Sequence, residues 1–265
     1  MSLFTTEDVA AFQADRLIIA ASAYWPSVTL SQSYLLQQLR AAEADIARQL
    51  KVRLKPTTFF PFEPTQEEID AVTPGYDYDE EPGYDYSAEF FQADSWGYIV
   101  TRARPIIAVD YIRFAYPDQR GVFYSIPDGW IRLDKKIGHI RLVPTQVLGT
   151  LPLTVFIMQA MGGGRGVPGM IQVKYDAGLR NVKTDPKWAD LLDVIYKSAT
   201  LKVIKGAFLP QSGSISADGL SQSLSVDASK YGEDIQESLF GPKGSNGGLF
   251  SSIHGLGGTA LGASA

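Results

Sequence analysis

Residues 170–206 read MIQVKYDAGLRNVKTDPKWADLLDVIYKSATLKVIKG, and the spacing of their apolar side chains changes once along this stretch. Ile171, Val173 and Tyr175 alternate with polar residues, which predicts a half-buried strand. Asp185 and Pro186 then supply a helix cap and first turn. A stripe at steps of three and four follows, formed by Trp188, Leu192, Ile195, Ala199 and Val203. We predict a helix over 186–205, ended by Gly206, and hence a mixed α+β chain.

Helical spacing also occurs on the N-terminal side. Apolar residues recur at steps of three and four after the candidate cap Ser31, namely Leu35, Leu39, Ala42, Ile46 and Leu50. This spacing predicts a helix over 31–52. A shorter helix over 6–15 is predicted from Thr5 and Asp8, which are spaced as a capping pair. Nearer the C-terminus, residues 228–239 favour another short helix, after a Ser-rich stretch with alternating apolar residues at 212–225.

Between these helices, the segment from Tyr98 to Leu179 is rich in β-branched and aromatic residues separated by turn residues such as Pro127-Asp128-Gly129. Strands are predicted at 98–102, 106–116, 121–126, 130–134, 139–143, 153–161 and 170–175. Short strands at this spacing favour an antiparallel sheet or small barrel.

A long acidic segment precedes the predicted strands. No Lys or Arg occurs between Thr57 and Gly97, whereas 11 acidic residues lie between Glu63 and Asp94. The pentapeptide Pro-Gly-Tyr-Asp-Tyr occurs twice, at 74–78 and 82–86. Acidic, proline-rich composition favours a solvated loop whose tyrosines dock onto a neighbour.

The expected organisation therefore has five parts. Residues 1–52 form N-terminal bundle helices, 53–97 the acidic Pro/Tyr-rich loop, and 98–180 a large antiparallel β-rich insertion. Residues 181–240 form the C-terminal helices and Ser-rich arm of the bundle. Residues 241–265, with eight Gly, four Ser and one charged residue, form a flexible Gly-rich tail. The fold class is α+β, a helical bundle with a β-rich insertion and an extended C-terminal arm.

Composition excludes several classes of function. The 265 residues include no Cys and only two His, which excludes disulfides, thiolate zinc sites and cysteine nucleophiles. No run approaches the roughly 18 to 20 apolar residues that cross a bilayer, and the N-terminus lacks the pattern of a signal peptide. We expect no membrane partner.

No motif predicts a catalytic, cofactor or metal site. Residues 164–169 match G-x-G-x-x-G, but they precede a predicted strand instead of a helix, so a loop over 162–169 is expected. Asp77, Asp79 and Glu81 resemble the start of a calcium loop, but Pro82 occupies the glycine position and Ala88 the glutamate position. His139 and His254 have no local partner that would make either a catalytic base. A pair of carboxylates that meet only in the fold remains an alternative.

Two segments together carry a family resemblance. They are the helix Tyr34-Leu-Leu-Gln-Gln-Leu-Arg-Ala-Ala-Glu-Ala-Asp-Ile46, and the stretch 190–196 leading to Ile215-Ser-Ala-Asp-Gly-Leu-Ser-Gln-Ser223. The chain resembles the head-to-tail adaptor, or connector, proteins of tailed bacteriophages. The resemblance covers about a third of the chain, and the β-rich block at 53–180 is larger than the compact family members carry. It implies a helical bundle that assembles as a ring, a dodecamer, beneath the portal protein, with a C-terminal arm docked on the portal.

The resemblance also implies a location and partners. The protein would be made in the host cytoplasm and would reside in the neck of the virion. Its partners would be a portal protein, a tail or tail-completion protein, and DNA contacted only non-specifically in the channel.

Expected portal-binding residues are Phe240, Leu249, Phe250, Ile253 and Leu256. We expect deletion of 241–265 to leave the fold intact and abolish partner binding. Expected inter-subunit residues are acidic (Asp77, Asp79, Glu80, Glu81, Asp85) and basic (Arg132, Lys135, Lys136). Another tail, neck or baseplate component and a carboxylate-dependent hydrolase are the alternatives.

Overall fold

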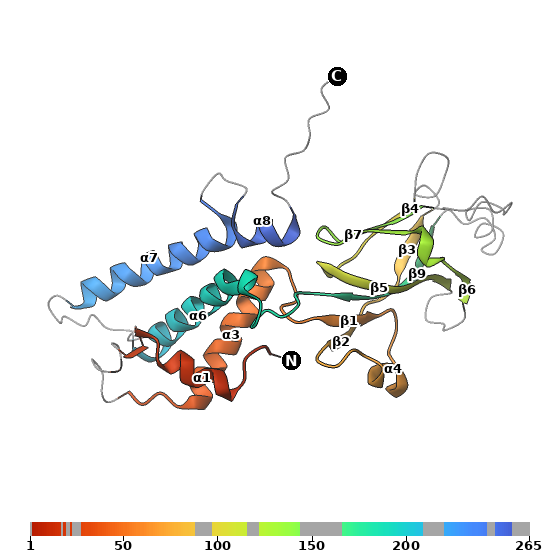
Figure 1. Ribbon diagram of the computed structural model, residues 1–265. Coiled ribbons are helices and arrows are strands. Elements are labelled where there is room, and N and C mark those ends of the chain that lie inside the picture. The colour runs from red at the N-terminus through yellow and green to blue at the C-terminus, as the bar shows by residue number, and fades with distance from the viewer. Residues whose placement is uncertain are drawn as a thin grey trace, which may run out of the picture. The chain divides into compact units, whose positions relative to one another are not determined.

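The computed structural model describes residues 2–16, 18–19, 22, 28–87, 97–115, 122–143, 166–208, 220–242 and 247–255. The chain folds as two compact units. The first, the helical unit, combines Met1–Leu54 with Asn181–Ala265, and the second, the β unit, is Lys55–Arg180. Figure 1 shows that both ends of the chain supply helices, whereas the middle supplies strands. The chain is thus mixed α+β.

The helical unit contains α1 (Thr6–Gln13), α3 (Gln32–Leu50), α6 (Ala189–Val203), α7 (Leu220–Phe240) and α8 (Gly248–His254). Helix α3 packs on α1 and α6, α6 packs on α7, and α7 packs on α8. The predicted stripe of α3 is fully buried, with Leu35, Leu39 and Ile46 among its residues. The helices predicted at 6–15 and 31–52 are confirmed, because apolar spacing at 3.6 residues per turn places these side chains on one face.

Local chemistry fixes where these helices begin. The Ser31 hydroxyl accepts a 3.2 Å hydrogen bond from the backbone N–H of Tyr34, and Thr5 and Asp8 form the predicted capping box.

An ion pair between Lys202 of α6 and Asp45 of α3 joins the two long helices. The Lys202 ammonium lowers the pKa of Asp45 against the opposing effect of burial, so this pair stabilises the folded state above the ordinary pKa of an aspartate.

The helix predicted over 186–205 differs at both ends. It begins with a 3₁₀ turn, η3 (Pro186–Trp188), and α6 is followed by a π turn, η4 (Ile204–Phe208), so Gly206 does not end the helix. A Cβ at Gly206 would lie 2.7 Å from the Tyr34 hydroxyl. A larger residue at this position would therefore require the Tyr34 side chain to move.

The larger sheet of the β unit has the strand order β2-β1-β9-β5-β6, and β3 also pairs with β9. Its strands are β1 (Thr57–Phe60), β2 (Asp77–Glu80), β3 (Tyr84–Ser87), β5 (Ile106–Ala115), β6 (Val122–Ser125) and β9 (Gly166–Ala177). The long strand β9 pairs with β5 along one edge, and with β3 and then β1 along the other. All these pairs are antiparallel except β1 with β2, which is parallel and lies outside the segment 98–180 for which antiparallel strands were predicted.

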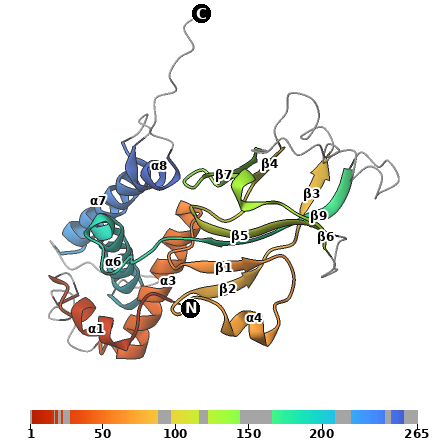
Figure 2. The same cartoon turned by 45° about the vertical axis from the view of Figure 1, so that its right-hand side comes forward.

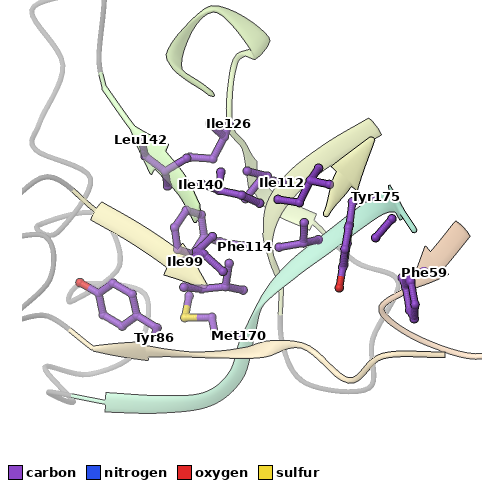
Figure 3. Close-up of a cluster of buried hydrophobic side chains, with 14 of the residues drawn as sticks. Phe59, Tyr86, Ile99, Ile112, Phe114, Ile126, Ile140, Leu142, Met170 and Tyr175 are labelled. Carbon is purple, nitrogen blue, oxygen red and sulfur yellow. The ribbon is translucent and has the colours of Figure 1, made fainter. Parts of the chain in front are cut away.

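A second sheet contains β4 (Gly97–Val100), β8 (His139–Leu142) and β7 (Ile131–Asp134), in that order. Its buried side chains, such as Ile140 and Leu142 of β8, join one apolar cluster with Ile112 and Phe114 of β5 (Figure 3). The strands predicted between 98 and 143 are therefore confirmed in position but divide between two sheets around a shared core. The strand predicted at 153–161 lies outside the described residues.

Over its described residues 53–87, the acidic segment is not a solvated loop. It contributes β1, β2, β3 and a short helix, α4 (Gln66–Asp70), to the β unit. Tyr86 of the second pentapeptide is buried, and a Cβ at Gly83 would lie 2.4 Å from the Gly169 carbonyl oxygen. In β3, tyrosines alternate with an acid, so the strand can bury its aromatic face and expose its acidic face. Burial of the aromatic face stabilises a strand in spite of the acidic composition of the segment. The expected loop at 162–169 is likewise wrong where described, since Gly166–Gly169 begin β9.

Two described parts of the C-terminal segment also differ from the expected flexible tail and extended arm. Residues 220–225 lie in α7, and 248–254 form α8, whose Ile253 and His254 are buried. His254 Nε2 lies 2.6 Å from the carbonyl oxygen of Leu50, at the C-terminal end of α3. Tertiary burial therefore orders a short helix that its glycine-rich composition disfavours.

No helix in the described ranges is long and apolar enough to cross a membrane.

Candidate partner-binding surfaces

The first candidate surface, called here the acidic surface, comprises strand β2 and helix α4 of the β unit. The exposed side chains there include Glu80 of β2 and Glu67 and Asp70 of α4. Tyr78, in the middle of β2, is 51% exposed. Strand β2 is also the edge of the larger sheet in its described strand order. Strand β2 therefore exposes an acid, Glu80, and an aromatic ring, Tyr78, which lie two residues apart on one face of the strand.

The half-buried acids of β2 have local roles as well. Asp79 accepts a 3.0 Å hydrogen bond from the backbone N–H of Glu80. The backbone N–H of Asp77 bonds to Pro56 at 2.9 Å and holds β2 against β1. The backbone N–H of Glu80 already donates to the Asp79 side chain, so it is not available to another strand. This edge is therefore partly protected against strand addition. Contacts at β2 are thus expected through side chains.

Glu81 does not belong to the acidic surface, which corrects its predicted inter-subunit role. Its side chain is only 7% exposed and accepts hydrogen bonds from the hydroxyls of Tyr84 and Tyr175, the latter at 2.7 Å. Arg102 lies 3.8 Å from the same carboxylate. Burial, followed by the neighbouring carboxylate, raises the pKa of Tyr84, whereas burial followed by Tyr84 and Glu81 raises that of Tyr175, so both remain neutral donors. A buried carboxylate with two such donors stabilises the fold.

Asp85 also faces an internal partner. Its carboxylate accepts a 2.9 Å hydrogen bond from the backbone N–H of Gly169, which joins β3 to β9. Of the five predicted acids, Asp77, Asp79 and Glu80 thus lie together on β2, while Glu81 and Asp85 bond within the β unit.

The second candidate surface, called here the arginine face, is the exposed side of the β4-β8-β7 sheet. Cross-strand register places Tyr98 of β4 opposite Arg141 of β8, and Arg141 opposite Arg132 of β7. All three side chains are exposed, and Tyr98 is 44% exposed. Val100, in the next row, is 42% exposed. The face therefore combines two adjacent cations with exposed apolar side chains.

The three predicted basic residues differ in their surroundings. Arg132 Nη1 donates to the carbonyl oxygen of Gly129 at 2.7 Å, which orients its guanidinium. Lys135 donates from Nζ to the carbonyl oxygen of Ile107 at 2.9 Å, so it secures the β7–β8 turn to β5. Lys136, in the same turn, is exposed. Arg132 and Lys136 are thus exposed to a partner, whereas Lys135 already donates a hydrogen bond within the β unit.

The third candidate surface is the apolar end of α7 and α8 in the helical unit. Phe240 is 39% exposed and lies 5.9 Å from Phe250, between ring centroids, while Leu249 and Phe250 are half-buried. Ile253 is only 4% exposed, so its predicted role as a portal contact is wrong: it packs inside the helical unit. Leu256 lies outside the described residues. The remaining apolar patch is Phe240, Leu249 and Phe250.

The described residues were also considered as ligands of a metal ion and as catalytic groups, with the following arrangement. No group of three or more His, Asp or Glu side chains that could hold a metal ion occurs in the described part of the chain. His139 lies beside the ring of Tyr98, 6.2 Å between centroids, and His254 is buried against α3.

Sequence reasoning expected the tyrosines of the repeated pentapeptide, Tyr78 among them, to dock onto a neighbour, but it did not place Tyr98, Val100 or Arg141 on a partner-binding surface. Alternation of exposed and buried residues in 97–100 and 139–142 is the available signal for the last three, because residues two apart share a face. Which of them lie opposite each other depends on the strand register, and this requires the structure.

The sequence and the structure were compared with those of known proteins. No protein-family model matches the sequence, and no curated protein matches it. The chain is similar to a chain in a solved structure of the virion of a native gene transfer agent particle, with 14% sequence identity and a TM-score of 0.35. The likeness covers 77% of this chain and 84% of that chain.

Proposed function

We propose that this protein is a structural subunit of a tailed-phage-type virion, a head-to-tail adaptor that assembles as a ring between portal and tail. In this proposal the protein acts by assembly and without catalytic turnover. It is made in the host cytoplasm and resides in the neck of the virion. Its partners are other copies of itself, a portal protein, a tail or tail-completion protein, and DNA passing through the channel with sequence-independent contacts.

The observation that carries this proposal is the construction of the helical unit from both ends of the chain. The segments that resemble the adaptor family, 34–46 and 190–196, lie in α3 and α6, and these two helices pack directly on each other. A β unit of 126 residues, Lys55–Arg180, is inserted between them. This arrangement fits an adaptor bundle that carries an additional module for lateral or tail-side contacts.

A second feature fits a portal contact. Phe240 and Phe250 form an apolar patch where α7 meets α8, and exposed aromatic side chains are enriched at protein interfaces. We assign this patch to the portal, with Leu249 beside it, and leave the β unit for contacts between copies.

The experiment that tests the adaptor role is binding to the portal ring of the virus or virus-like particle that encodes the chain. Purified full-length protein is mixed with assembled portal and separated by size, and the complex is imaged by negative stain. We expect a second ring stacked on the portal, and we expect Phe240→Ser with Phe250→Ser to reduce binding at least tenfold. If the protein assembles as a ring but does not bind the portal, it belongs to another part of the virion.

A further inference from the structure

The arginine face contains an unfavourable pair in the isolated subunit. Arg132 and Arg141 lie directly opposite each other on adjacent antiparallel strands, and both are exposed on the same side of the sheet. Directly opposed like charges destabilise a strand pair. Neither arginine forms a salt bridge within the described residues. An anionic group placed over both guanidinium groups would relieve this repulsion with charge-assisted hydrogen bonds.

The exposed apolar residues on the same face point to a protein as the source of that anion. Tyr98 is next to Arg141 in the same row, and Val100 follows in the next row. An interface that combines an aromatic anchor with arginines gains both buried apolar area and charge-directed specificity. The partner surface should therefore present carboxylates around an apolar ring.

The acidic surface of the same chain has this composition. Glu80, Glu67 and Asp70 are exposed there, and Tyr78 supplies the apolar ring. In both views of the β unit, β2 and α4 lie on the side away from β4 and β7 (Figures 1 and 2). One subunit thus carries two surfaces of opposite charge on opposite sides of the compact β unit.

We propose that the acidic surface of one copy docks on the arginine face of the next copy. Because the two surfaces are different and lie on opposite sides, the contact is head-to-tail, and repetition of it gives either a closed ring or an open filament. This inference rests on the proposed function, since it names the contact that builds the adaptor ring. It places Tyr78 of one copy against Tyr98 and Val100 of its neighbour.

Nucleic acid is the competing occupant of the arginine face. The β unit as a whole contains twelve Lys and Arg but sixteen Asp and Glu, so it is net acidic. Proteins that bind nucleic acid through phosphates carry a clear basic excess, and a net acidic unit repels the polyanion at long range. The carboxylates of a second copy are therefore favoured over phosphate.

The test uses two charge-reversal variants of the full-length chain. The acid-side variant is Glu67→Lys with Asp70→Lys and Glu80→Lys, and the basic-side variant is Arg132→Glu with Lys136→Glu and Arg141→Glu. Mass photometry and sedimentation measure assembly over a wide concentration range, and circular dichroism checks folding. We expect each variant alone to assemble at least tenfold more weakly than the wild type, because like charges then face each other.

Mixing the two variants provides the decisive readout. An alternating arrangement brings opposite charges together at every contact, so an equimolar mixture should assemble while neither variant does so alone. A matched control, Arg16→Glu with Lys205→Glu and Lys230→Glu, changes the same amount of charge in the helical unit and should leave assembly unchanged. The recovery in the mixture also shows that loss of assembly did not come from misfolding.

Three results would overturn the inference. Rings formed equally well by both variants alone would preserve the adaptor proposal and place the contact elsewhere. A short DNA duplex could bind the wild type and fail to bind the basic-side variant, while both proteins assemble to the same mass. That result would assign the arginine face to nucleic acid. A wild-type chain that stays monomeric at all concentrations would remove both the contact and the ring.

Discussion

The Tyr175 hydroxyl donates a 2.7 Å hydrogen bond to the buried carboxylate of Glu81, across 94 residues of sequence. The same hydroxyl accepts a 3.1 Å hydrogen bond from the backbone N–H of Ala103. Tyr175 therefore joins three separate segments: strand β9, the segment that links β2 to β3, and the turn after β4. Through Glu81 this network fixes where β2 and β3 enter and leave the larger sheet, and so it positions the acidic surface.

Tyr175→Phe is expected to destabilise the β unit by about 1–3 kcal/mol, because it leaves a buried carboxylate and a backbone amide each with one partner fewer. Tyr78→Phe is the matched control, since Tyr78 is exposed and should change the free energy of unfolding by less than about 0.5 kcal/mol. Urea unfolding followed by tyrosine and tryptophan fluorescence measures both. Equal effects of the two variants would show that the network contributes nothing to stability.

Alkaline pH should destabilise the wild-type protein above about 10. Burial is the first cause that raises the pKa of Tyr84 and Tyr175 above the ordinary value of 10.0, so these phenols stay neutral in the folded state. In the unfolded state they ionise as the pH passes 10, which favours unfolding as the pH rises further. Thermal unfolding from pH 8 to 11 should show this loss, and Tyr175→Phe should reduce its slope. An unchanged slope would contradict a neutral buried Tyr175.

Gly83→Ala should disrupt the junction of β3 with β9. The added Cβ would lie 2.4 Å from the carbonyl oxygen of Gly169, and backbone on both sides leaves no flexible side chain to yield. We expect a loss of about 1–3 kcal/mol or more. Gly166→Ala is the control, because its Cβ would make an ordinary 3.6 Å contact with Tyr86. Thermal melts of the two variants should differ clearly; a neutral Gly83→Ala would show that this close approach is relaxed in solution.

Removal of α8 should destabilise the helical unit, which reverses the expectation from sequence that the whole of 241–265 is dispensable for folding. Ile253 is buried and His254 bonds to the carbonyl of Leu50, so Ile253→Ala should cost about 2–5 kcal/mol. A chain ending at Gly255 retains both residues and should keep wild-type stability. Chemical denaturation compares it with a chain ending at Gly241. If both truncations unfold at the wild-type midpoint, α8 is not part of the core.

Sequence periodicity predicted the elements whose own residues determine their structure. In α3, a buried stripe and a serine cap suffice to place a helix. In β5, β-branched residues place a strand, and in β9 the alternation of Ile171, Val173 and Tyr175 with polar residues places its second half. The elements that were missed depend on distant partners. Tyr86 of β3 pairs with Val167, 81 residues away, and α8 is stabilised by its contact with the end of α3. Composition in these segments favours loop, and burial outweighs it.

The candidate surfaces were predictable only in part. Charge asymmetry identified Glu80 and Arg132 as members of opposite-sign surfaces. It could not distinguish Glu80, which is exposed, from Glu81, which is buried beneath two tyrosines, because adjacent residues on a strand face opposite sides. The opposition of Arg132 and Arg141 depends on hairpin register, and composition carries no information about register.

The mass of the purified full-length protein, measured over a wide concentration range with negative-stain images of the largest species, distinguishes a ring-forming adaptor from a protein that does not assemble. The adaptor account predicts a closed ring of one size, a dodecamer, that dissociates as salt increases because charged surfaces join its copies. A protein that remains monomeric at every concentration, or that forms filaments of unlimited length and no closed species, would contradict it.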